Sequence, residues 1–487
     1  MKLLKDILYG INITDLRGST LVAINEVTCD SRLIKKDNLF FAIKGSKSDG
    51  HKFIAKSISE GAQAIVCEVL PENIVKDITY IQVISTSKAY AIVASNWFER
   101  PSEKLHVVGI TGTNGKTTTA SLLYKLFENS LIKTGLISTI KIAIGNKELP
   151  TTHTTPDAWT IQKHMAEMLA AGCKIVFIEV SSHGLVQNRV EGIRFKGGIF
   201  TNISRDHLDY HKNMDSYILA KKSLFDNLKP SSFALANFDD KHGETMFSNC
   251  EAKKVSYGIE RHVDIKARIL ESHIGGTLIS INQRECWMQL IGNFNVYNIC
   301  AVYGAAIELG LEPTEALQGI SALQSVDGRF QKIEGPKGII GIVDYAHTPD
   351  ALDNILSSLQ KFRNSSQRII TIIGCGGNRD TGKRPQMASM AARLSDYVIF
   401  TSDNPRNELP ANILKDMENG LTLLEKKHCI TIEDRSQGIK LACQNAKPKD
   451  IILLAGKGHE KFQEIHGEKL PFDDVIILKK LLTEVQA

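Results

Sequence analysis

The sequence lacks the features that mark secreted, membrane-spanning or nucleic-acid-binding proteins. Its 487 residues contain nine cysteines, scattered singly without a C-x-x-C pair, so we expect neither a disulfide framework nor a zinc cluster. No apolar run approaches the length of a membrane span, and the start MKLLKDILYGINI has too short an apolar core for a signal peptide. The net charge of +5 comes without a basic block. We therefore expect a soluble, cytoplasmic protein with no nucleic acid and no membrane among its partners, and a charge this small suits anionic small molecules. We also expect a monomer, which the composition does not determine.

The spacing of apolar segments divides the chain into three regions. Residues 1–103 hold short strands such as NLFFAI and AQAIVCEV between polar turns, and the charged segment FERPSEKLH follows as a linker. In residues 104–328, and again in residues 329–487, continuous apolar strands alternate with helical stretches. Such strands, for example KIVFIEV and RIITIIG, are typical of buried parallel sheets with helices on both faces. We predict an α/β protein of three domains with these boundaries: a smaller N-terminal domain, a central parallel sheet and a C-terminal Rossmann-like domain.

A glycine-rich loop separates the strand HVVGIT from an amphipathic helix. The strict phosphate-loop pattern G-x-x-x-x-G-K-[ST] needs glycine at position 110, where this chain has isoleucine, so residues 111–117 form a variant of it. Gly112 and Gly115 let backbone N–H groups converge, and the following helix adds its positive end. Lys116 would hold the outer phosphates, and the Thr117 hydroxyl a Mg²⁺ ion. The alternative is a glycine turn with an exposed lysine, but the order of strand, loop and helix favours a central sheet of the P-loop ATPase type.

Polar residues follow two neighbouring strands of the central region. Glu179 lies at the end of KIVFIEV, and His207 follows GGIFTNI within SRDHLDYH. Because ligands gather at the carboxyl ends of parallel strands, these two side chains could share a Mg²⁺ ion with bound phosphates. Each could instead be an ordinary satisfied polar residue, an alternative that the phosphate loop makes less attractive. DHLDYH also suggests a larger metal cluster, from which we predict only His207 as a ligand, because one loop cannot aim all four side chains at one point.

A series of motifs resembles one known family along nearly the whole chain. In order, these are GTNGKTT, EVSSHGL, TNISRDHLDYH, GNFNVYN, DGRFQ, DYAHTPD, GCGGNRDTGKRP, DNPR and GKGHE. They resemble the Mur ligases of peptidoglycan synthesis, which use ATP to form amide bonds. The segments TCDSR and DNPR are similar to those of the members that add the third peptide residue to UDP-N-acetylmuramoyl-L-alanyl-D-glutamate.

The resemblance implies a role for each domain and for particular residues. Residues 1–103 would bind the UDP end of the substrate, residues 104–328 ATP, and residues 329–487 the incoming amino acid. The implied ATP contacts are Gly112, Thr113, Asn114, Gly115, Lys116, Thr117, Thr118, Asn295, Asn298, Arg329, Asp344 and His347. The implied contacts for the UDP-linked substrate are Ser31, Thr154, Thr155, Ser181, Gln187 and Arg189. The implied Mg²⁺ ligands are Thr117, Glu179, His207 and Lys221.

Lys221 is a metal ligand in this scheme only as a modified residue. The family carries a carbamylated lysine in a helix with the pattern A-K-x-x-L-[FY], and Lys221 matches it in AKKSLF. An ammonium group would repel Mg²⁺, whereas a carbamate supplies a negative charge and oxygen ligands. The resemblance thus makes Lys116, His207 and carbamylated Lys221 the catalytic residues; without it, Lys221 would be taken for a surface lysine.

The motif DNPR bears on which amino acid is added. Within the family it accompanies meso-diaminopimelate, and other residues in place of the arginine accompany lysine. Diaminopimelate has one carboxylate more than lysine, which the guanidinium of Arg406 can bind in bidentate fashion. Lysine would leave that arginine without a partner, which can reject an analogue by a factor of about 10⁴. The implied diaminopimelate contacts are Arg379, Asp403, Asn404, Pro405, Arg406, Gly456 and Glu460, with Glu460 facing the distal ammonium group.

Two other functions remain open from the sequence. One is a lysine-adding ligase, or a relative of folylpolyglutamate synthase, against which the first region and DNPR both argue. The other is a nucleotide-switched binding protein of the P-loop type, which would have little need for GCGGNRD, DNPR and GKGHE. We predict an amide ligase that requires ATP and Mg²⁺. ATP would turn the D-glutamate carboxylate into an acyl phosphate, which the incoming amine then attacks.

Overall fold

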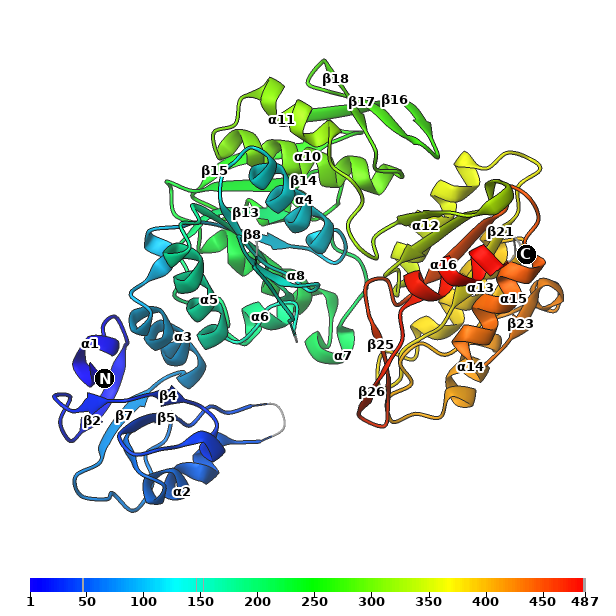
Figure 1. The fold of residues 1–487 in the computed structure, drawn as a ribbon. Coiled ribbons are helices and arrows are strands. Elements are labelled where there is room, and N and C mark those ends of the chain that lie inside the picture. Colours follow the sequence, from blue (N-terminus) through cyan, green and yellow to red (C-terminus); the bar gives the residue numbers. More distant parts are fainter. Residues whose placement is uncertain (46–47, 146, 152, 485–487) are drawn as a thin grey trace.

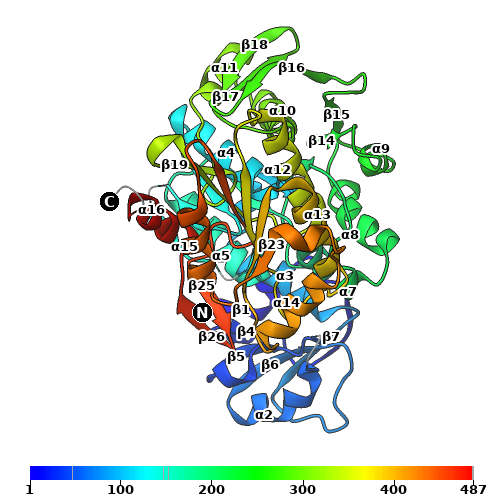
Figure 2. The same ribbon diagram turned by 90° about the vertical axis from the view of Figure 1, so that its right-hand side faces the viewer.

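The computed structural model describes residues 1–45, 48–145, 147–151 and 153–484. These residues form three α/β units around sheets of five, eleven and six strands, which we call the first, central and third units. Figure 1 shows the central unit between the other two, and Figure 2 shows the third unit in front of it with the first unit below. The α/β fold class predicted from the sequence is confirmed.

The first unit has a mostly parallel sheet. Its strand order is β2 (Ile13–Arg17), β7 (Thr79–Val83), β6 (Ala62–Cys67), β5 (Asn38–Phe41) and β4 (Val27–Thr28), with β2 antiparallel to its neighbour. The short strands β1 (Lys2–Leu3) and β3 (Ala23–Ile24) pair separately. Apolar side chains of α1 (Leu4–Ile7) and α3 (Thr86–Trp97) pack on one core cluster, and those of α2 (Ile54–Ser59) on another. The predicted strands NLFFAI and AQAIVCEV correspond to β5 and β6.

The central sheet is parallel in its middle and antiparallel at both edges. Its strand order is β11 (Lys147–Leu149), β10 (Ile142–Ile144), β9 (Thr134–Ile137), β12 (Ile175–Glu179), β8 (His106–Thr111), β13 (Phe195–Phe200), β14 (Phe233–Asn237), β15 (Lys253–Gly258), β16 (Ile265–His273), β17 (Gly276–Ile281) and β18 (Arg284–Met288). One face packs against α4 (Lys116–Asn129), α10 (Asn293–Glu308) and α11 (Pro313–Ser321). The other packs against α5 (Ala158–Ala170), α8 (Met214–Asp226) and α9 (Gly243–Met246). The short helices α6 (Ser182–Val186) and α7 (Leu208–His211) follow β12 and β13.

The third unit repeats this layered arrangement. Its strand order is β19 (Gln331–Glu334), β20 (Ile340–Asp344), β24 (Ile451–Ala455), β21 (Ile369–Ile373), β22 (Tyr397–Phe400) and β23 (Cys429–Thr431), with β19 antiparallel to β20. Helices α12 (Pro349–Phe362), α13 (Lys383–Leu394) and α14 (Pro410–Glu418) cover one face. Helices α15 (Arg435–Asn445) and α16 (Asp474–Glu484) cover the other. A hairpin of β25 (Phe462–Ile465) and β26 (Glu468–Pro471) projects from this unit (Figure 1).

The segment predicted as a linker is partly folded. Pro101–Glu103 forms a 3₁₀ turn in which Pro101 and Ser102 are buried, and the Ser102 hydroxyl accepts a hydrogen bond of 3.0 Å from the Arg194 backbone N–H. Trp159 of α5 packs against Trp97, the last residue of α3, and against Phe98, which follows it. The ring centres lie 5.6 Å apart for Trp159 and Trp97 and 4.9 Å apart for Trp159 and Phe98. The connection between the first and central units is therefore a packed interface.

None of the helices in the described residues combines the length and the hydropathy that crossing a bilayer requires.

The interior of the third unit contains an ion pair, which gives a prediction about stability. Arg435 and Asp474 are both fully buried, with Nε–Oδ1 and Nη2–Oδ2 distances of 2.9 and 2.7 Å. Asp474→Ala would leave the guanidinium buried without a counter-charge, so we expect the free energy of unfolding to fall by about 3–5 kcal/mol in urea titrations. Glu484→Ala is the matched control, because Glu484 pairs with Lys480 at an exposed site on the same helix. Equal midpoints for the two variants would contradict the prediction.

Candidate functional site

A cavity of about 570 Å³ lies between the central and third units, where loops that follow strands of both sheets meet. Its lining includes most of the residues predicted from the sequence. These are Thr113, Asn114, Gly115, Lys116, Thr117, Thr118, Thr154, Glu179, His207, Asn295, Asn298, Arg329, Asp344, His347, Arg379, Asp403, Asn404, Arg406, Gly456 and Glu460. The lining does not include Ser31, Gly112, Thr155, Ser181, Gln187, Arg189, Lys221 or Pro405. One cavity thus brings together both predicted ligand loops, which are almost 300 residues apart in the sequence.

The loop between β8 and α4 requires both of its glycines. Gly112 and Gly115 have φ angles of +149° and +85°. A Cβ atom on Gly112 would lie 1.9 Å from the Thr201 hydroxyl oxygen, and one on Gly115 would lie 2.5 Å from the Asn298 side-chain oxygen. Any larger residue would therefore clash, and the loop backbone can approach a ligand closely.

Two residues that the sequence analysis did not select hold this loop in shape. The Thr201 hydroxyl donates a hydrogen bond of 2.6 Å to the Asn114 carbonyl. The Asn202 side chain accepts from the Asn114 N–H at 2.9 Å and donates to the Asn114 carbonyl at 3.1 Å. Both follow β13 in the motif TNISRDHLDYH, where the sequence analysis selected only His207.

Lys116 and Lys221 converge on the same loop from different helices. Lys116 Nζ donates to the carbonyls of Gly112 and Thr113 at 2.8 and 2.9 Å, and Lys221 Nζ donates to the Gly112 carbonyl at 2.7 Å. Burial lowers the pKa of both ammonium groups, and Lys116 lowers the pKa of Lys221 further. Lys221 is buried on α8, with its Nζ 4.6 Å from the centre of the Tyr217 ring. It is therefore not the surface lysine that the sequence without the resemblance would suggest.

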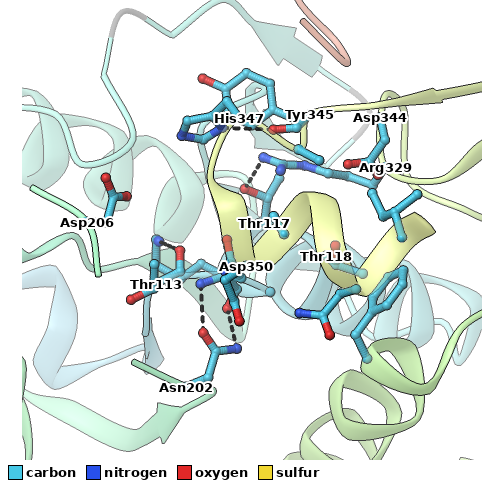
Figure 3. A pocket seen from close by; sticks show the side chains of 18 of the residues that line it. Thr113, Thr117, Thr118, Asn202, Asp206, Arg329, Asp344, Tyr345, His347 and Asp350 are labelled. Atoms are coloured by element: carbon cyan, nitrogen blue, oxygen red, sulfur yellow. Dashed lines mark hydrogen bonds between the residues drawn. The ribbon is translucent and has the colours of Figure 1, made fainter. Parts of the chain in front are cut away.

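The Thr117 hydroxyl joins the central and third units. It donates to Glu179 Oε2 at 2.9 Å and accepts from Arg329 Nη2, a group of the third unit, at 3.0 Å. Figure 3 shows Arg329 reaching Thr117 beside Asp344 and Tyr345. The guanidinium lies 4.5 Å from the centre of the Tyr345 ring. Glu179 is fully buried and also accepts from the Thr139 N–H at 2.7 Å.

A second contact between these two units involves Asp350, at the start of α12. Its Oδ2 accepts from the Asn114 side-chain amide at 2.9 Å and from the Ser204 hydroxyl at 3.3 Å. Asp350 is the last residue of the motif DYAHTPD. The sequence analysis gave roles to Asp344 and His347 of this motif, but none to Asp350. The motif was the available signal, but the partner residue lies 236 positions away.

Burial shifts the pKa values of the acid and base groups around the cavity. It raises the pKa of Asp344 to about 6, although Asp344 also accepts a 2.6 Å hydrogen bond from the Phe330 N–H. It lowers the pKa of His207 to about 4, against the opposing charge of Asp206, and that of His347 to about 4. Both imidazoles are therefore neutral at pH 7, and a neutral imidazole can bind a metal ion or accept a proton. His207 lines the cavity with 41% of its side chain exposed, and its Nε2 lies 3.4 Å from Asp206 Oδ2.

The residues predicted to contact the UDP-linked substrate fall into separate places. Four of them form a hydrogen-bonded network outside the cavity lining: Thr155, Ser181, Gln187 and Arg189. Within it, Arg189 donates to the Thr155 carbonyl and to Gln187 Oε1, each at 2.6 Å. Thr154 accepts from the Thr139 hydroxyl at 3.0 Å. Ser31 lies apart, in a 3₁₀ turn of the first unit at Ser31–Leu33.

The loop carrying DNPR differs in one respect from the sequence-based expectation. The sequence analysis expected Arg406 to bind the distal carboxylate of diaminopimelate and to have no partner when lysine binds. In the structure, its Nε lies 3.2 Å from Glu464 Oε2, and its Nη1 donates to the Gly377 carbonyl at 2.9 Å. The expectation was wrong on this point because β25 pairs with the backbone at Arg406, which places Glu464 beside the guanidinium. A ligand carboxylate would share or replace an existing ion pair.

Arg384, which lies between Arg379 and Arg406 in the sequence, forms ion pairs within the third unit. Arg384 is buried and lies 2.9 Å from Glu408 and 2.8 Å from Asp416, so it ties α13 to the loop before α14 and to α14 itself. Arg379, by contrast, is exposed and lines the cavity. Gly456, with φ of +111°, lies against Asp403, where a Cβ atom would be 2.6 Å from Asp403 Oδ2.

Comparison with known proteins gives matches along nearly the whole chain. Three family models match: the Mur ligase family catalytic domain over residues 23–103, the Mur ligase middle domain over residues 110–306, and the Mur ligase glutamate ligase domain over residues 328–458. Two relatives named UDP-N-acetylmuramoyl-L-alanyl-D-glutamate–2,6-diaminopimelate ligase, from Cytophaga hutchinsonii and Parabacteroides distasonis, are each 48% identical. The alignments cover 98% and 99% of this chain and 99% and 100% of the relatives.

Solved structures show the same similarity. A structure of a ligase with the same name is 29% identical, has a TM-score of 0.70, and is matched over 100% of this chain and 99% of its own. The MurF ligase from Thermotoga maritima in complex with ADP shares the fold, with 18% identity, a TM-score of 0.63, and coverage of 95% and 98%. From these matches over the full length of the chain, the protein belongs to the Mur ligase family.

Proposed function

We propose that the protein joins meso-diaminopimelate to the D-glutamate of UDP-N-acetylmuramoyl-L-alanyl-D-glutamate, with hydrolysis of ATP, in peptidoglycan synthesis. The single cavity that contains both the phosphate loop and the Arg406 loop carries this proposal, because an amide ligase must bring nucleotide and amine to one carboxylate. The relatives that share 48% of the sequence are named for this reaction. A switch protein would not need the second loop.

The nucleotide end of the cavity fits a triphosphate. The glycine loop gives space for close approach, the N-terminus of α4 favours negative charge, and Lys116 supplies an ammonium at the loop. Asn295 and Asn298 are buried side by side in the lining, with a hydrogen bond of 3.1 Å between them, and would face the adenine. Arg329, Asp344 and His347 would reach the nucleotide from the third unit.

The residues around Thr117 also fit Mg²⁺. The Thr117 hydroxyl and the Glu179 carboxylate are hard oxygen donors 2.9 Å apart at the cavity wall, and His207 adds a neutral imidazole in the same lining. Such a set leaves coordination positions for phosphate oxygens and water. When bound, the ion would screen the phosphates and polarise the γ-phosphoryl group.

The reaction needs two displacements, the first at the γ-phosphorus of ATP and the second at the carbonyl carbon of the D-glutamate side chain. A carboxylate oxygen of the D-glutamate attacks the γ-phosphorus, so an acyl phosphate forms and ADP leaves. The amine of diaminopimelate then attacks the carbonyl carbon, a tetrahedral intermediate forms, and phosphate leaves as the amide is completed with loss of a proton. Lys116 and Arg329 would offset the negative charge of the approaching groups, and the enclosed cavity would limit hydrolysis of the acyl phosphate.

The environment of Lys221 supports its modification to a carbamate. An amine must be deprotonated to attack CO₂, and burial beside Lys116 lowers the Lys221 pKa in that direction. The carbamate would offer the metal ion an oxygen ligand and a negative charge, which the ammonium groups of Lys116 and Lys221 do not supply.

All assigned residues come from one chain, so we propose that a monomer holds the complete site. Because ATP and a UDP-linked substrate must both reach the cavity, we place the reaction in the cytoplasm.

The first prediction concerns the amino acid. With UDP-dipeptide and Mg-ATP supplied, phosphate release should depend on meso-diaminopimelate, and Arg406→Ala should raise the KM for it about tenfold to a hundredfold, as expected for one charged hydrogen-bonding partner. The KM for ATP should change less than about twofold. Arg393→Ala, which removes an exposed arginine at the end of α13, is the control. Equal wild-type turnover with lysine would refute the proposed specificity.

The second prediction concerns the phosphate loop. Lys116→Ala should lower kcat at least about a hundredfold, because it removes a preorganised charge that acts on the developing negative charge. Lys125→Ala, on the same helix and outside the cavity lining, should retain the wild-type rate. A Lys116→Ala variant with near-normal turnover would show that ATP reacts elsewhere.

The third prediction concerns Lys221. Lys221→Ala should be nearly inactive at pH 7.5, and acetate or propionate should restore part of its activity by supplying the missing carboxylate oxygens. The same salts should leave Lys116→Ala inactive, which makes that variant the control. Failure of every short-chain carboxylate to raise the Lys221→Ala rate would count against the carbamate.

A further inference from the structure

A buried lysine in the third unit has no role in the mechanism described so far. Lys457 follows β24, and its side chain has no exposed surface. Its Nζ donates to Asn404 Oδ1 at 3.0 Å and to Glu460 Oε2 at 3.1 Å. The rings of Phe462 and Phe472 flank the ammonium group, with centres 6.0 and 5.9 Å away. Both polar partners of this buried charge line the cavity, at the end assigned to the amino acid.

Lys457 fixes the orientation of the Asn404 amide. Asn404 Oδ1 receives two donors, Lys457 Nζ and the backbone N–H of Glu464 at 2.9 Å. A flipped amide would point its NH₂ group at both donors, so the Glu464 N–H would lose this acceptor, Lys457 would keep only Glu460, and the amide oxygen would face a carboxylate oxygen. The NH₂ group must therefore face Glu460, to whose Oε2 it donates at 2.7 Å.

These contacts occupy one side of the Glu460 carboxylate. Oε2 accepts from both Asn404 and Lys457, whereas within the described part of the chain no hydrogen bond reaches Oε1. Glu460 lines the cavity, so Oε1 is the oxygen left for a ligand. A carboxylate held in this way presents one acceptor in a fixed direction.

The charges around Glu460 show why it needs a cation. Burial and the neighbouring Asp403 carboxylate raise its pKa, and Lys457 opposes both effects. Of the other cations of this region, Arg406 is paired with Glu464 and Arg435 with Asp474, and Arg379 is an exposed guanidinium of the cavity lining. The Tyr345 phenol also faces this region, and burial raises its pKa, so it remains neutral. Lys457 is thus the cation in contact with Glu460 that opposes this rise.

We infer that Lys457 is a positioning residue for the distal ammonium group of the incoming diamino acid, because it keeps Glu460 as a carboxylate and aims its Oε1 into the cavity. This inference rests on the proposed function, since it assumes that an amino acid with a distal ammonium occupies this end of the cavity. Lys457 itself touches neither the reacting carboxyl group nor the attacking amine.

Replacement of Lys457 tests the inference through the pH dependence of substrate binding. In Lys457→Met, Glu460 would be a largely buried carboxyl group beside Asp403 without a cation, so its pKa should rise further. A smaller share would then be ionised at pH 7, so the KM for diaminopimelate should rise about tenfold or more, as one pKa unit implies. Because the carboxylate returns as the pH rises, the ratio of variant to wild-type KM should fall to less than about threefold at pH 9. The kcat and the KM for ATP should stay within about threefold of wild type.

A double-mutant cycle separates positioning from general damage to the fold. Glu460→Gln should raise the same KM, and Lys457→Met should add less than about twofold in that background, because the group through which it acts is gone. Arg368→Met is the matched control: it removes a cation paired with the buried Asp450 at 2.6 Å, at the opposite end of β21 in the same unit. It should leave the KM for diaminopimelate and its pH dependence unchanged.

Each result has a distinct meaning. A Lys457→Met variant whose KM stays within twofold of wild type at pH 7, or whose effect is the same size in the Glu460→Gln background, overturns the inference. A KM ratio that is constant between pH 7 and 9 does so as well. If Lys457→Met does not fold, Lys457→Gln, which keeps an N–H donor and loses the charge, is measured in the same way. Absence of wild-type turnover with diaminopimelate would instead refute the proposed function itself.

Discussion

The guanidinium of Arg329 holds together the two halves of the site. It extends from the third unit, lies against the Tyr345 ring and donates to the Thr117 hydroxyl at the start of α4. Its charge also moderates the rise in the Asp344 pKa that burial causes. The Asp350–Asn114 hydrogen bond is a second polar contact between the two units, and Ile291 and Phe294 of the central unit pack on the apolar core of the third. Together these contacts bring the carboxyl ends of the two parallel sheets to one cavity.

Enclosure of that cavity sets the ionisation of its walls. The same burial that raises the Asp344 pKa to about 6 lowers those of His207 and His347 to about 4. The histidines are therefore neutral groups at pH 7, and the positive charge offered to a bound nucleotide would come from lysine and arginine side chains. The arrangement suits a reaction between two anions, since fixed cations need no proton uptake to offset the approaching charge.

Local sequence determines much of this structure, and distant contacts determine the rest. The apolar strands, the glycine loop and α4 could be predicted because their periodicity and turn chemistry are written in consecutive residues. The motif order and the full-length resemblance identified the family. Asp350, Thr201 and Asn202 were not selected, because each acquires its role from a partner 87 or more positions away. The Arg406–Glu464 pair was missed for the same reason, since it depends on how the β25–β26 hairpin folds back on the DNPR loop.

That last pair alters how selection of the amino acid should be understood. The end of the cavity proposed to bind the amino acid contains two ion pairs, Arg406 with Glu464 and Lys457 with Glu460. A head group that carries both an ammonium and a carboxylate would leave the net charge of this end unchanged and could interact with both ion pairs. A side chain ending in a lone ammonium would place a positive charge beside Glu460 and Asp403 and would have no carboxylate to exchange for Glu464 at Arg406. Arg406 would keep a partner in either case, so the penalty for the wrong amino acid would be smaller than that of a guanidinium left alone.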